Sequence, residues 1–243
     1  MTWLNGKVVE NRRWTETLFS LCVEAPKLAF QAGQFVRIAL DVDGQRVARA
    51  FSFVNPPQDP VLEFYGIVVP GGPLSPRLER LRAGERLLVA SNPAGFLVLS
   101  EVPEAKTLWL VSTGTGIAPF LSILRTETPW TRFRNVVLVH AVRHAAELVY
   151  QDVIRKISKE RDLRTVTFVS REAHDGSLAG RIPSGLRDGR LEKAAGLALD
   201  HDAHVMLCGN PDMLKDAQAA LAERGLRKHR RRNPGHITVE SFW

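Results

Sequence analysis

The sequence of 243 residues contains only two cysteines, Cys22 and Cys208, which lie in different halves and form no C-x-x-C pair. This scarcity argues against a disulfide framework or a cysteine metal site and fits a reducing cytoplasm. No uninterrupted apolar run is long enough to span a bilayer, so no membrane segment is expected. The first residues lack the apolar stretch of a secretory signal, so we expect none.

Internal repeats and low-complexity stretches are also missing, and the 44% hydrophobic and 24% charged residues are ordinary for a soluble globular protein. The chain has 33 Lys and Arg against 26 Asp and Glu, a net charge of +7. Such a surface attracts nucleic acid, nucleotide phosphates and acidic proteins alike. No helix-turn-helix, zinc-finger or RNA-recognition signature is present, so we expect no nucleic acid partner.

The chain is long enough for two ordinary domains, and its texture changes near residues 100–103. Before this point, short apolar or alternating runs are separated by Gly, Pro and Asp-Gly turns. The expected strands cover residues 19–23, 34–40, 47–54, 62–67 and 86–89. Strands spaced this closely predict an antiparallel barrel or sandwich in residues 1–100.

One short helix is expected to interrupt these strands. Ser75 is a good N-cap residue, Pro76 suits the first helical position, and Leu78 and Leu81 repeat at helical spacing. The two glycines before it leave the backbone free to approach a bulky group. The exposed N–H groups of such a helix start suit an anion, but Ser75 equally suits the capping of a plain surface helix.

Residues 101–243 alternate between strands and helices. The expected strands cover residues 107–112, 135–142, 164–170 and 203–208, and the expected helices cover residues 119–124, 145–159 and 211–224. This alternation predicts a parallel sheet with helices on both faces. The whole chain is therefore predicted to be an antiparallel β-barrel followed by an α/β domain. Ligands of such a sheet lie beyond the carboxyl ends of its strands.

The first of these strands ends in a glycine-containing run, Gly114-Thr115-Gly116-Ile117-Ala118-Pro119. The glycines permit a tight turn and close approach of a phosphate to a helix start. Pro119 replaces the third glycine of G-x-G-x-x-G, and the acidic residue expected about twenty positions later for the ribose is absent. The second strand ends instead near Arg143. The sequence therefore disfavours a standard NAD-type Rossmann domain.

The third strand ends at Ser170 and Arg171, and Arg181 follows in the next loop. One hydroxyl and two guanidinium groups suit a ribose 2′-phosphate, because Arg binds phosphate in a bidentate manner. The alternative is that both arginines are ordinary solvated surface charges. Their placement at consecutive loops on the ligand side favours NADP over NAD.

Two further positions carry residues suited to a flat cofactor. Cys208 ends the fourth strand, where its side chain suits contact with a ring, although a free cysteine is more commonly a small buried hydrophobe. In the first half, Arg49-Ala50-Phe51-Ser52 joins a guanidinium, an aromatic face and a hydroxyl. On a strand, Arg49 and Phe51 point to one side and Ala50 and Ser52 to the other. This pattern suits a flavin, with Ser52 at its redox-active edge.

Six short motifs follow one another along the chain: residues 49–52 (RAFS), 72–75 (GPLS), 114–119 (GTGIAP), 170–172 (SRE), 180–183 (GRIP) and 208–211 (CGNP). In this order and spacing they resemble the bacterial flavodoxin/ferredoxin–NADP+ reductases over essentially the whole chain. The resemblance implies an FAD-binding antiparallel β-barrel in residues 1–100 and an NADP-binding α/β domain in residues 101–243.

The resemblance also implies roles for single residues: Arg49 meets the FAD pyrophosphate, Phe51 stacks on the isoalloxazine, and Ser52 lies near flavin N5. The implied FAD contacts are Arg49, Ala50, Phe51, Ser52, Tyr65, Gly72, Pro73, Leu74, Ser75, Thr115, Phe242 and Trp243. The implied NADP contacts are Thr115, Arg143, Ser170, Arg171, Arg181, Cys208, Asn210 and Asp212. Ser52, Cys208 and Glu240 are the implied catalytic residues, which position nicotinamide or manage a proton at N5, and no metal is implied.

Two features of the aromatic residues bear on this assignment. Members of the family commonly carry Tyr where this chain has Phe51, so stacking is kept and a phenolic hydrogen bond is lost. The chain ends in Phe242 and Trp243, which either close the core of the second domain or, as the resemblance implies, cover the isoalloxazine and the adenine of FAD. In the second case Phe242 must move before nicotinamide can stack.

The implied reaction passes a hydride from NADPH to FAD and then single electrons to ferredoxin or flavodoxin. The basic run 227–232 either steers such an acidic carrier or is a solvated loop. We expect a cytoplasmic monomer. The rivals are an oxygenase reductase component built on the same module, which lacks the paired arginines when it uses NADH, and a non-enzymatic flavin subunit of a larger dehydrogenase. Many proteins of both kinds need cluster cysteines that this chain lacks.

Overall fold

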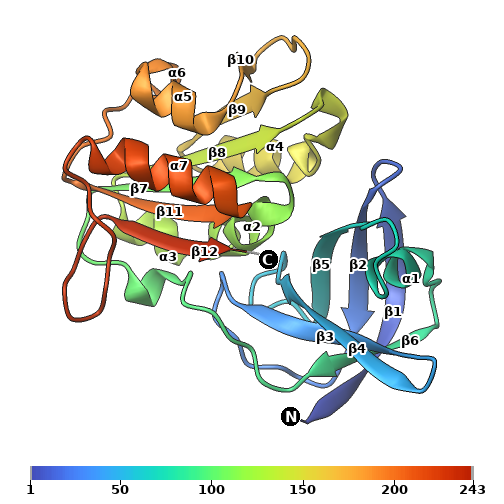
Figure 1. Cartoon of the computed structure of the whole chain (residues 1–243). Helices are drawn as coiled ribbons and strands as arrows, with labels where there is room; N and C mark the ends of the chain where they lie inside the picture. Colours follow the sequence, from blue (N-terminus) through green and yellow to red (C-terminus); the bar gives the residue numbers. More distant parts are fainter. Residues whose placement is uncertain (1, 242–243) are drawn as a thin grey trace.

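The computed structural model describes residues 2–241, and they form two halves joined by one linker, residues 91–106 (Figure 1). The first half is a curled antiparallel sheet, here called the barrel, and the second is a parallel sheet covered by helices, here called the α/β half. The predicted fold class is confirmed. Within residues 2–241, no helix is both long and apolar enough to cross a membrane. Phe242 and Trp243, which were predicted to contact FAD, lie outside the described residues.

The barrel is a six-stranded sheet with the order β4-β3-β6-β1-β2-β5. The strands are β1 (Trp3–Arg13), β2 (Leu18–Glu24), β3 (Phe35–Val42), β4 (Gln45–Ser52), β5 (Val61–Ile67) and β6 (Arg86–Ala90). A bridge between Phe53 and Phe64 brings the end of β4 beside β5 and so closes the curl. Between β3 and β4, Asp43 and Gly44 have φ values of 50° and 76°, as a tight two-residue hairpin requires.

Strand β1 was not predicted, because its sequence carries few apolar residues. Only Gly6 and Val8 of this strand are buried, although β1 pairs with β2 on one side and β6 on the other. Gly6 is needed there, since a Cβ atom would lie 2.7 Å from a methyl group of Val23. The strand is therefore held by its backbone pairing more than by an apolar pattern.

The α/β half is a six-stranded parallel sheet with the order β10-β9-β8-β7-β11-β12. The strands are β7 (Thr107–Thr113), β8 (Asn135–Val142), β9 (Leu163–Val169), β10 (Leu178–Ala179), β11 (Ala203–Gly209) and β12 (Ile237–Ser241). The chain starts this sheet in the middle, builds outward through β8 and β9, and then returns to the other side of β7. The order therefore reverses between β7 and β11, which is the crevice where such sheets bind ligands.

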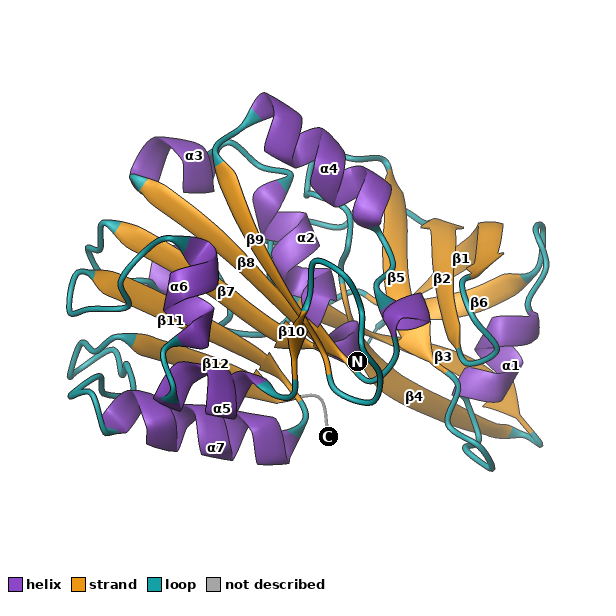
Figure 2. Ribbon diagram, turned by 90° about the horizontal axis from the view of Figure 1, so that it is seen from above, coloured by secondary structure: helices purple, strands orange, loops and turns teal. Residues whose placement is uncertain are grey.

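Helices cover both faces of the parallel sheet (Figures 1 and 2). On one face lie α2 (Ala118–Leu124), α3 (Thr128–Arg132) and α4 (Gln151–Glu160), and on the other lie α5 (Ile182–Arg187), α6 (Arg190–Ala195) and α7 (Pro211–Ala222). The prediction of one helix over residues 145–159 was wrong at its start. Residues 145–147 form an isolated 3-10 turn, and Tyr150 adopts φ 61°, so α4 begins only at Gln151. The reason is that Tyr150 turns toward the barrel.

An apolar core continues from one half into the other. Leu18, Val54 and Tyr65 of the barrel belong to the same buried cluster as Phe120 and Leu121 of α2. The two halves are therefore packed against each other directly, and the linker is not their only connection.

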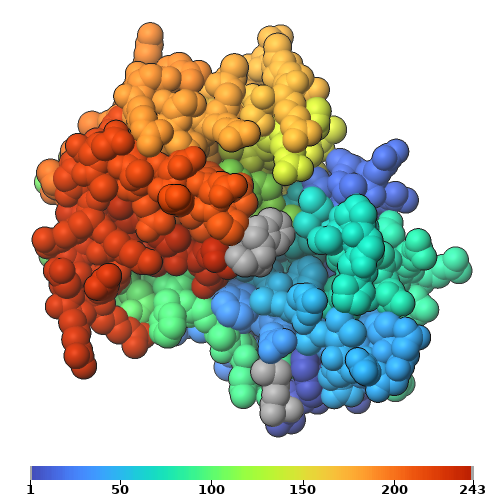
Figure 3. Space-filling model, in the orientation of Figure 1, coloured from blue at the N-terminus to red at the C-terminus, as the bar shows by residue number. Residues whose placement is uncertain are grey.

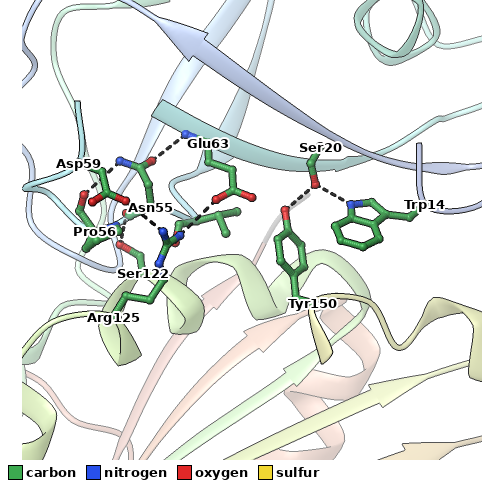
Figure 4. A network of polar contacts seen from close by, with 10 residues as sticks. Trp14, Ser20, Asn55, Pro56, Asp59, Glu63, Ser122, Arg125 and Tyr150 are labelled. Carbon is green, nitrogen blue, oxygen red and sulfur yellow. Dashed lines mark hydrogen bonds and ion pairs between the residues drawn. The ribbon is translucent and has the colours of Figure 1, made fainter. Parts of the chain in front are cut away.

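Directional polar contacts cross the same interface (Figure 4). Arg125, at the end of α2, donates to the Asp59 carboxylate at 3.0 Å, the Glu63 carboxylate at 3.2 Å and the Val54 carbonyl at 3.3 Å. The Ser122 hydroxyl donates to the carbonyl of Asn55 at 2.7 Å. These bonds fix how α2 sits on the barrel.

A second polar cluster lies on the other side of the interface in Figure 4. The Tyr150 hydroxyl is hydrogen-bonded to the Ser20 hydroxyl, which also accepts from the Trp14 indole N–H at 2.7 Å. The Tyr150 ring meets the Tyr65 ring edge-on, with centroids 5.4 Å apart. Tyr150 is thus the residue by which the segment before α4 contacts the barrel.

We predict that Arg125→Met lowers the free energy of unfolding by roughly 1–3 kcal/mol, because it leaves two half-buried carboxylates and a carbonyl without their donor. Urea unfolding followed by circular dichroism measures this. Arg46→Met is the matched control, since Arg46 also pairs with a carboxylate, Asp41, but both side chains are more exposed. The control should change little. Equal losses in the two variants would contradict the role assigned to Arg125.

Candidate functional site

A cavity of about 270 Å³ lies where the barrel meets the α/β half. It is lined by strands β4 and β5, the segment leading into helix α1 (Ser75–Arg80), and the start of α2. All ten described residues predicted to contact FAD line it: Arg49, Ala50, Phe51, Ser52, Tyr65, Gly72, Pro73, Leu74, Ser75 and Thr115. Segments far apart in the sequence therefore meet at one site, while the role of each residue toward FAD stays a prediction.

Strand β4 contributes four successive residues, Arg49 to Ser52, to this lining. The alternation predicted from the sequence places them on two faces of the strand. Residues of both faces nevertheless line the cavity at the end of β4, an edge strand that pairs with β3. The short motif can for this reason offer a guanidinium, a ring and a hydroxyl to one ligand.

The cavity is also lined by four residues that were not predicted: Gly66, Ile67, Val69 and Ala118. Gly66 could have been found, because a glycine inside an apolar strand indicates close approach of another group. A Cβ atom at this position would lie 2.9 Å from ring atoms of both Phe51 and Phe19. Gly66 therefore makes room for the Phe51 ring.

Two buried hydroxyl groups of the cavity lining have no hydrogen-bond partner, those of Ser52 and Tyr65. Burial, followed by the charge of Glu147, raises the pKa of Tyr65, so this phenol is protonated and available as a donor. A buried polar atom without a partner costs roughly 1–3 kcal/mol, and native proteins seldom carry one without a reason. Both hydroxyls suit contact with polar atoms of a bound ligand.

The short helix predicted near Ser75 is present as α1, but the predicted cap is wrong. Ser75 is the first helical residue, Leu74 occupies the N-cap position, and no side chain caps the helix. The Ser75 hydroxyl instead accepts a hydrogen bond from the backbone N–H of Val69 at 2.9 Å. Ser75 therefore closes the loop that leads into the helix.

The glycine-containing turn after β7 is held against β11 and β8. A Cβ atom on Gly116 would lie 2.5 Å from the carbonyl oxygen of Cys208, so only glycine lets the turn lie against β11. His140 of β8 is hydrogen-bonded through Nε2 to the Gly114 carbonyl at 3.0 Å. Burial lowers the pKa of His140 to about 4, so the ring is neutral and its Nε2–H donates. His140 was missed because nothing in the sequence separates it from other strand residues.

The three predicted catalytic residues are connected through the linker. Cys208 of β11 lies beside Glu240 of β12 in the strand register. A Cβ atom on Gly95 of the linker would lie 2.9 Å from the Glu240 carboxylate and 3.1 Å from Phe35, and Phe35 pairs with Ser52. Cys208 is thus a direct strand neighbour of Glu240, whereas Ser52 is linked to Glu240 only through Phe35 and Gly95.

Glu240 and Cys208 are both held away from solvent. Burial raises the pKa of Glu240 to about 7, against the opposing effect of the Phe96 N–H that it accepts, and one carboxylate oxygen has no partner. Burial and then the charge of Glu240 raise the pKa of Cys208 well above its usual range. The Cys208 thiol is therefore a neutral, fully buried group.

The residues predicted for the 2′-phosphate follow two adjacent strands at their carboxyl ends. Arg143 follows β8, Ser170 and Arg171 follow β9, and Arg181 directly precedes α5. The backbone joins the first two loops, because Arg171 N–H donates to the Arg143 carbonyl at 3.0 Å. All four residues are exposed, and no described residue pairs with the three guanidinium groups. They are free to bind an anion.

Asn210 and Asp212, also predicted to contact NADP, lie at the start of α7. Asn210 is the N-cap residue, and its side-chain oxygen accepts from the Met213 N–H at 2.9 Å. Its amide nitrogen donates to the Thr113 hydroxyl at 3.3 Å. Asn210 is therefore already engaged within the protein, whereas Asp212 is exposed. Among residues 2–241, no group of three or more His, Cys, Asp or Glu is arranged to hold a metal ion.

Comparison with known proteins accounts for both halves. Residues 4–97 match the oxidoreductase FAD-binding domain and residues 110–219 the oxidoreductase NAD-binding domain. The flavodoxin/ferredoxin–NADP reductases of Shigella flexneri and Escherichia coli are each 51% identical over 99% of both chains. The chain belongs to the flavodoxin/ferredoxin–NADP reductase family. A ferredoxin NADP+ reductase from Neisseria gonorrhoeae, solved with bound FAD and NADP, matches with a TM-score of 0.96 at 32% identity over all of both chains.

The residues of this reductase suit a flavin on the evidence of the cavity itself. Ser52 and Tyr65, whose buried hydroxyls have no partner, both line it, Phe51 offers a ring, and Gly66 accommodates that ring. These groups match the polar and flat parts of an isoalloxazine with its ribityl chain. The lining therefore fits FAD, and Arg49 stays the predicted cation for its pyrophosphate.

For this reductase we predict that Glu240→Gln changes how stability depends on pH. The carboxyl titrates near 4.5 when unfolded and near about 7 when folded, so between these values the folded state holds one more proton. The contribution of Glu240 to the free energy of unfolding therefore falls as the pH rises from 4.5 to about 7, and it is constant above pH 7. The Gln variant, compared with the wild type by urea unfolding at equal FAD, should be no more stable at pH 4 and roughly 1–3 kcal/mol more stable at pH 8.

The matched control is Glu104→Gln, since Glu104 is an exposed glutamate of the linker. It should follow the wild type at both pH values. A Glu240→Gln variant whose stability also ran parallel to the wild type between pH 4 and 8 would show that the carboxyl is not buried as described.

Proposed function

We propose that this protein is an FAD-dependent ferredoxin (flavodoxin)–NADP+ reductase, which moves electrons between NADP(H) and a one-electron carrier protein. The observation that carries the proposal is the single cavity into which every described FAD-candidate residue falls, at the junction with the switch point of the parallel sheet. The barrel, residues 1–100, is the FAD domain, and residues 101–243 are the NADP domain.

FAD, when bound, supplies the redox chemistry by taking up a hydride and giving up single electrons. The protein's own residues bind and orient it. Arg49 neutralises the pyrophosphate, Phe51 lies against the ring system, and the Ser52 hydroxyl contacts the redox-active edge. The segment from Gly72 to Ser75 supports the phosphate end, and Thr115 borders the place where the two cofactors meet.

NADP(H) enters at the reversal between β7 and β11. Arg143, Ser170, Arg171 and Arg181 hold the adenosine 2′-phosphate, and their free guanidinium groups support this role. Asp212 and the backbone around Asn210 border the nicotinamide half at the start of α7. The three arginines lie on consecutive loops, which is why NADP is preferred over NAD.

At the meeting point of the cofactors, Cys208 fills space beside the nicotinamide and excludes water because it is fully buried and neutral. The raised pKa of Glu240 lets its carboxyl hold a proton near neutral pH, while the Phe96 N–H holds one side of the group in place. Ser52 and Glu240 are the groups able to hold or move a proton at this edge.

We further propose a cytoplasmic, monomeric protein whose carrier is ferredoxin or flavodoxin. Both cysteines are free, which suits a reducing compartment. The net charge of +7 favours acidic partners.

The function is tested with purified protein in two assays. The protein should show a flavin absorption spectrum, or gain one on addition of FAD, and NADPH should bleach it. With NADPH present the protein should reduce ferredoxin or flavodoxin. The reduced carrier passes its electrons to cytochrome c, whose absorbance change is the signal that is measured. A protein that stayed colourless with added FAD would refute the flavoenzyme, and one that reduced ferricyanide but no carrier would refute the carrier half alone.

We predict that Arg171→Ala lowers kcat/KM for NADPH by roughly 10- to 100-fold, because a charge-assisted phosphate contact is lost. For NADH, which has no 2′-phosphate, the loss should be within about twofold on the same reasoning. Stopped-flow reduction of the flavin with each nucleotide measures both. Arg155→Ala, an exposed arginine on α4, is the control and should leave both values unchanged. Equal losses for the two nucleotides would contradict the 2′-phosphate role.

A further inference from the structure

Only two large hydrophobic side chains are strongly exposed among residues 2–241, Val69 at 48% and Phe96 at 65%. Val69 lines the proposed FAD cavity, so a bound cofactor accounts for it. Phe96 lies in the linker and does not line that cavity. A single exposed apolar side chain is ordinary on a protein surface, so Phe96 needs further observations before it carries meaning.

The first observation is that Phe96 is held in place. Its backbone N–H binds the Glu240 carboxylate, and the Arg231 guanidinium lies over its ring at 4.9 Å from the centroid. Arg231 in turn makes a bidentate pair with Glu101, at 2.6 and 2.8 Å. An exposed aromatic side chain beside an arginine is the composition typical of the energetic centre of a protein–protein interface.

The second observation is the charge beside it. The loop 223–236 between α7 and β12 projects from the α/β half, at the lower left of Figures 1 and 3. Residues 227–232 of this loop are Arg, Lys, His, Arg, Arg and Arg, and no acid occurs from residue 224 to 239. Within the described chain only Arg231 of this run pairs with a carboxylate. The other cations are free to attract an acidic surface.

The third observation is position. Phe96 directly follows Gly95, which lies against the Glu240 carboxylate and against Phe35, the strand partner of Ser52. The exposed ring is therefore beside the redox end of the proposed FAD site. Electron transfer between proteins weakens steeply with distance, so a carrier must dock near this end to be reduced.

We propose that Phe96 and the basic run 227–232 form the docking surface for an acidic one-electron carrier protein. Phe96 is the apolar anchor, Arg231 fixes its ring, and Arg230 and Arg232 steer the acidic rim of the carrier. The assignment rests on the proposed function, because that function supplies the carrier. It goes further by naming the face of the molecule and the residues that meet it.

The test compares electron transfer from NADPH to a purified acidic [2Fe–2S] ferredoxin, to a purified flavodoxin and to ferricyanide, which needs no docking surface. Phe96→Ser should raise KM for a carrier roughly 5- to 20-fold, the loss expected for an interface anchor. The loss with carrier should exceed that with ferricyanide by a similar factor. Phe96→Tyr keeps an exposed ring under Arg231 and should restore most of the carrier activity, which a merely structural role of Phe96 would not require.

The charge is tested by Arg230→Glu/Arg232→Glu against Arg155→Glu/Lys156→Glu, a matched double reversal on exposed residues of α4. The first pair should raise KM for the carrier roughly tenfold at low salt and flatten its salt dependence, as steering predicts. The second pair, with the same change in net charge, should leave the carrier KM within about twofold of the wild type, since steering acts at the docking face.

Three results would overturn the proposal. In the first, the wild type is active on carriers, and the Phe96 and Arg230/Arg232 variants have the same carrier KM as the wild type. This result would refute the docking surface and leave the proposed function intact. A wild type active on ferricyanide but on neither carrier would refute the carrier itself, and the surface with it. Binding of duplex DNA that is lost in the Arg230/Arg232 variant, with an unchanged carrier KM, would assign the loop to nucleic acid.

Discussion

The packing of α2 against the barrel is the contact on which the rest of the site depends. A cavity lined by two halves keeps its shape only if the halves cannot slide, and apolar packing alone resists sliding weakly because it has little direction. The Arg125 guanidinium and the Ser122 hydroxyl supply direction by meeting the segment around Asn55 and Glu63 at defined angles. The Tyr150 hydroxyl repeats this at Ser20 on the other side. Together these hydrogen bonds and ion pairs favour one relative orientation of the two halves.

The anchors of α2 lie on elements that also serve the site. Helix α2 spans seven residues, roughly 10 Å, with the Gly114–Ile117 turn at its start and Arg125 at its end. Strand β5 carries Glu63, which pairs with Arg125, and then Tyr65, which lines the cavity. A movement at the interface would thus reach the cofactor cavity through one short rigid element on each side. We therefore expect the half-buried charges here to contribute more than the exposed pairs elsewhere on the surface.

The sequence predicted the two folds because both leave local patterns, whereas most residues of the cavity were predicted only through the family resemblance of six short motifs. Alternation, turn residues and glycines at strand ends depend on neighbours in the chain. β1 was missed since backbone pairing on both edges holds it without an apolar face. The helix start at residue 145 was wrong because Tyr150 is drawn to Ser20, a contact across 130 positions. Ser75 was misassigned as a cap because its hydroxyl found the Val69 N–H. His140 acts through the Gly114 carbonyl, a neighbour distant in sequence that no short motif records.

The linker shows how one segment can serve the interior and the surface at once. It pairs with β3 where Ala94 meets Phe35, places Gly95 against the carboxylate of Glu240, and then turns the Phe96 side chain outward. Any side chain at Gly95 would collide with Glu240 and Phe35, and its φ of 110° also demands glycine. The backbone N–H that Phe96 gives to Glu240 and the ring that it exposes belong to the same residue. The Glu240 carboxyl and the outer face beside it are therefore fixed by the same two positions of the chain.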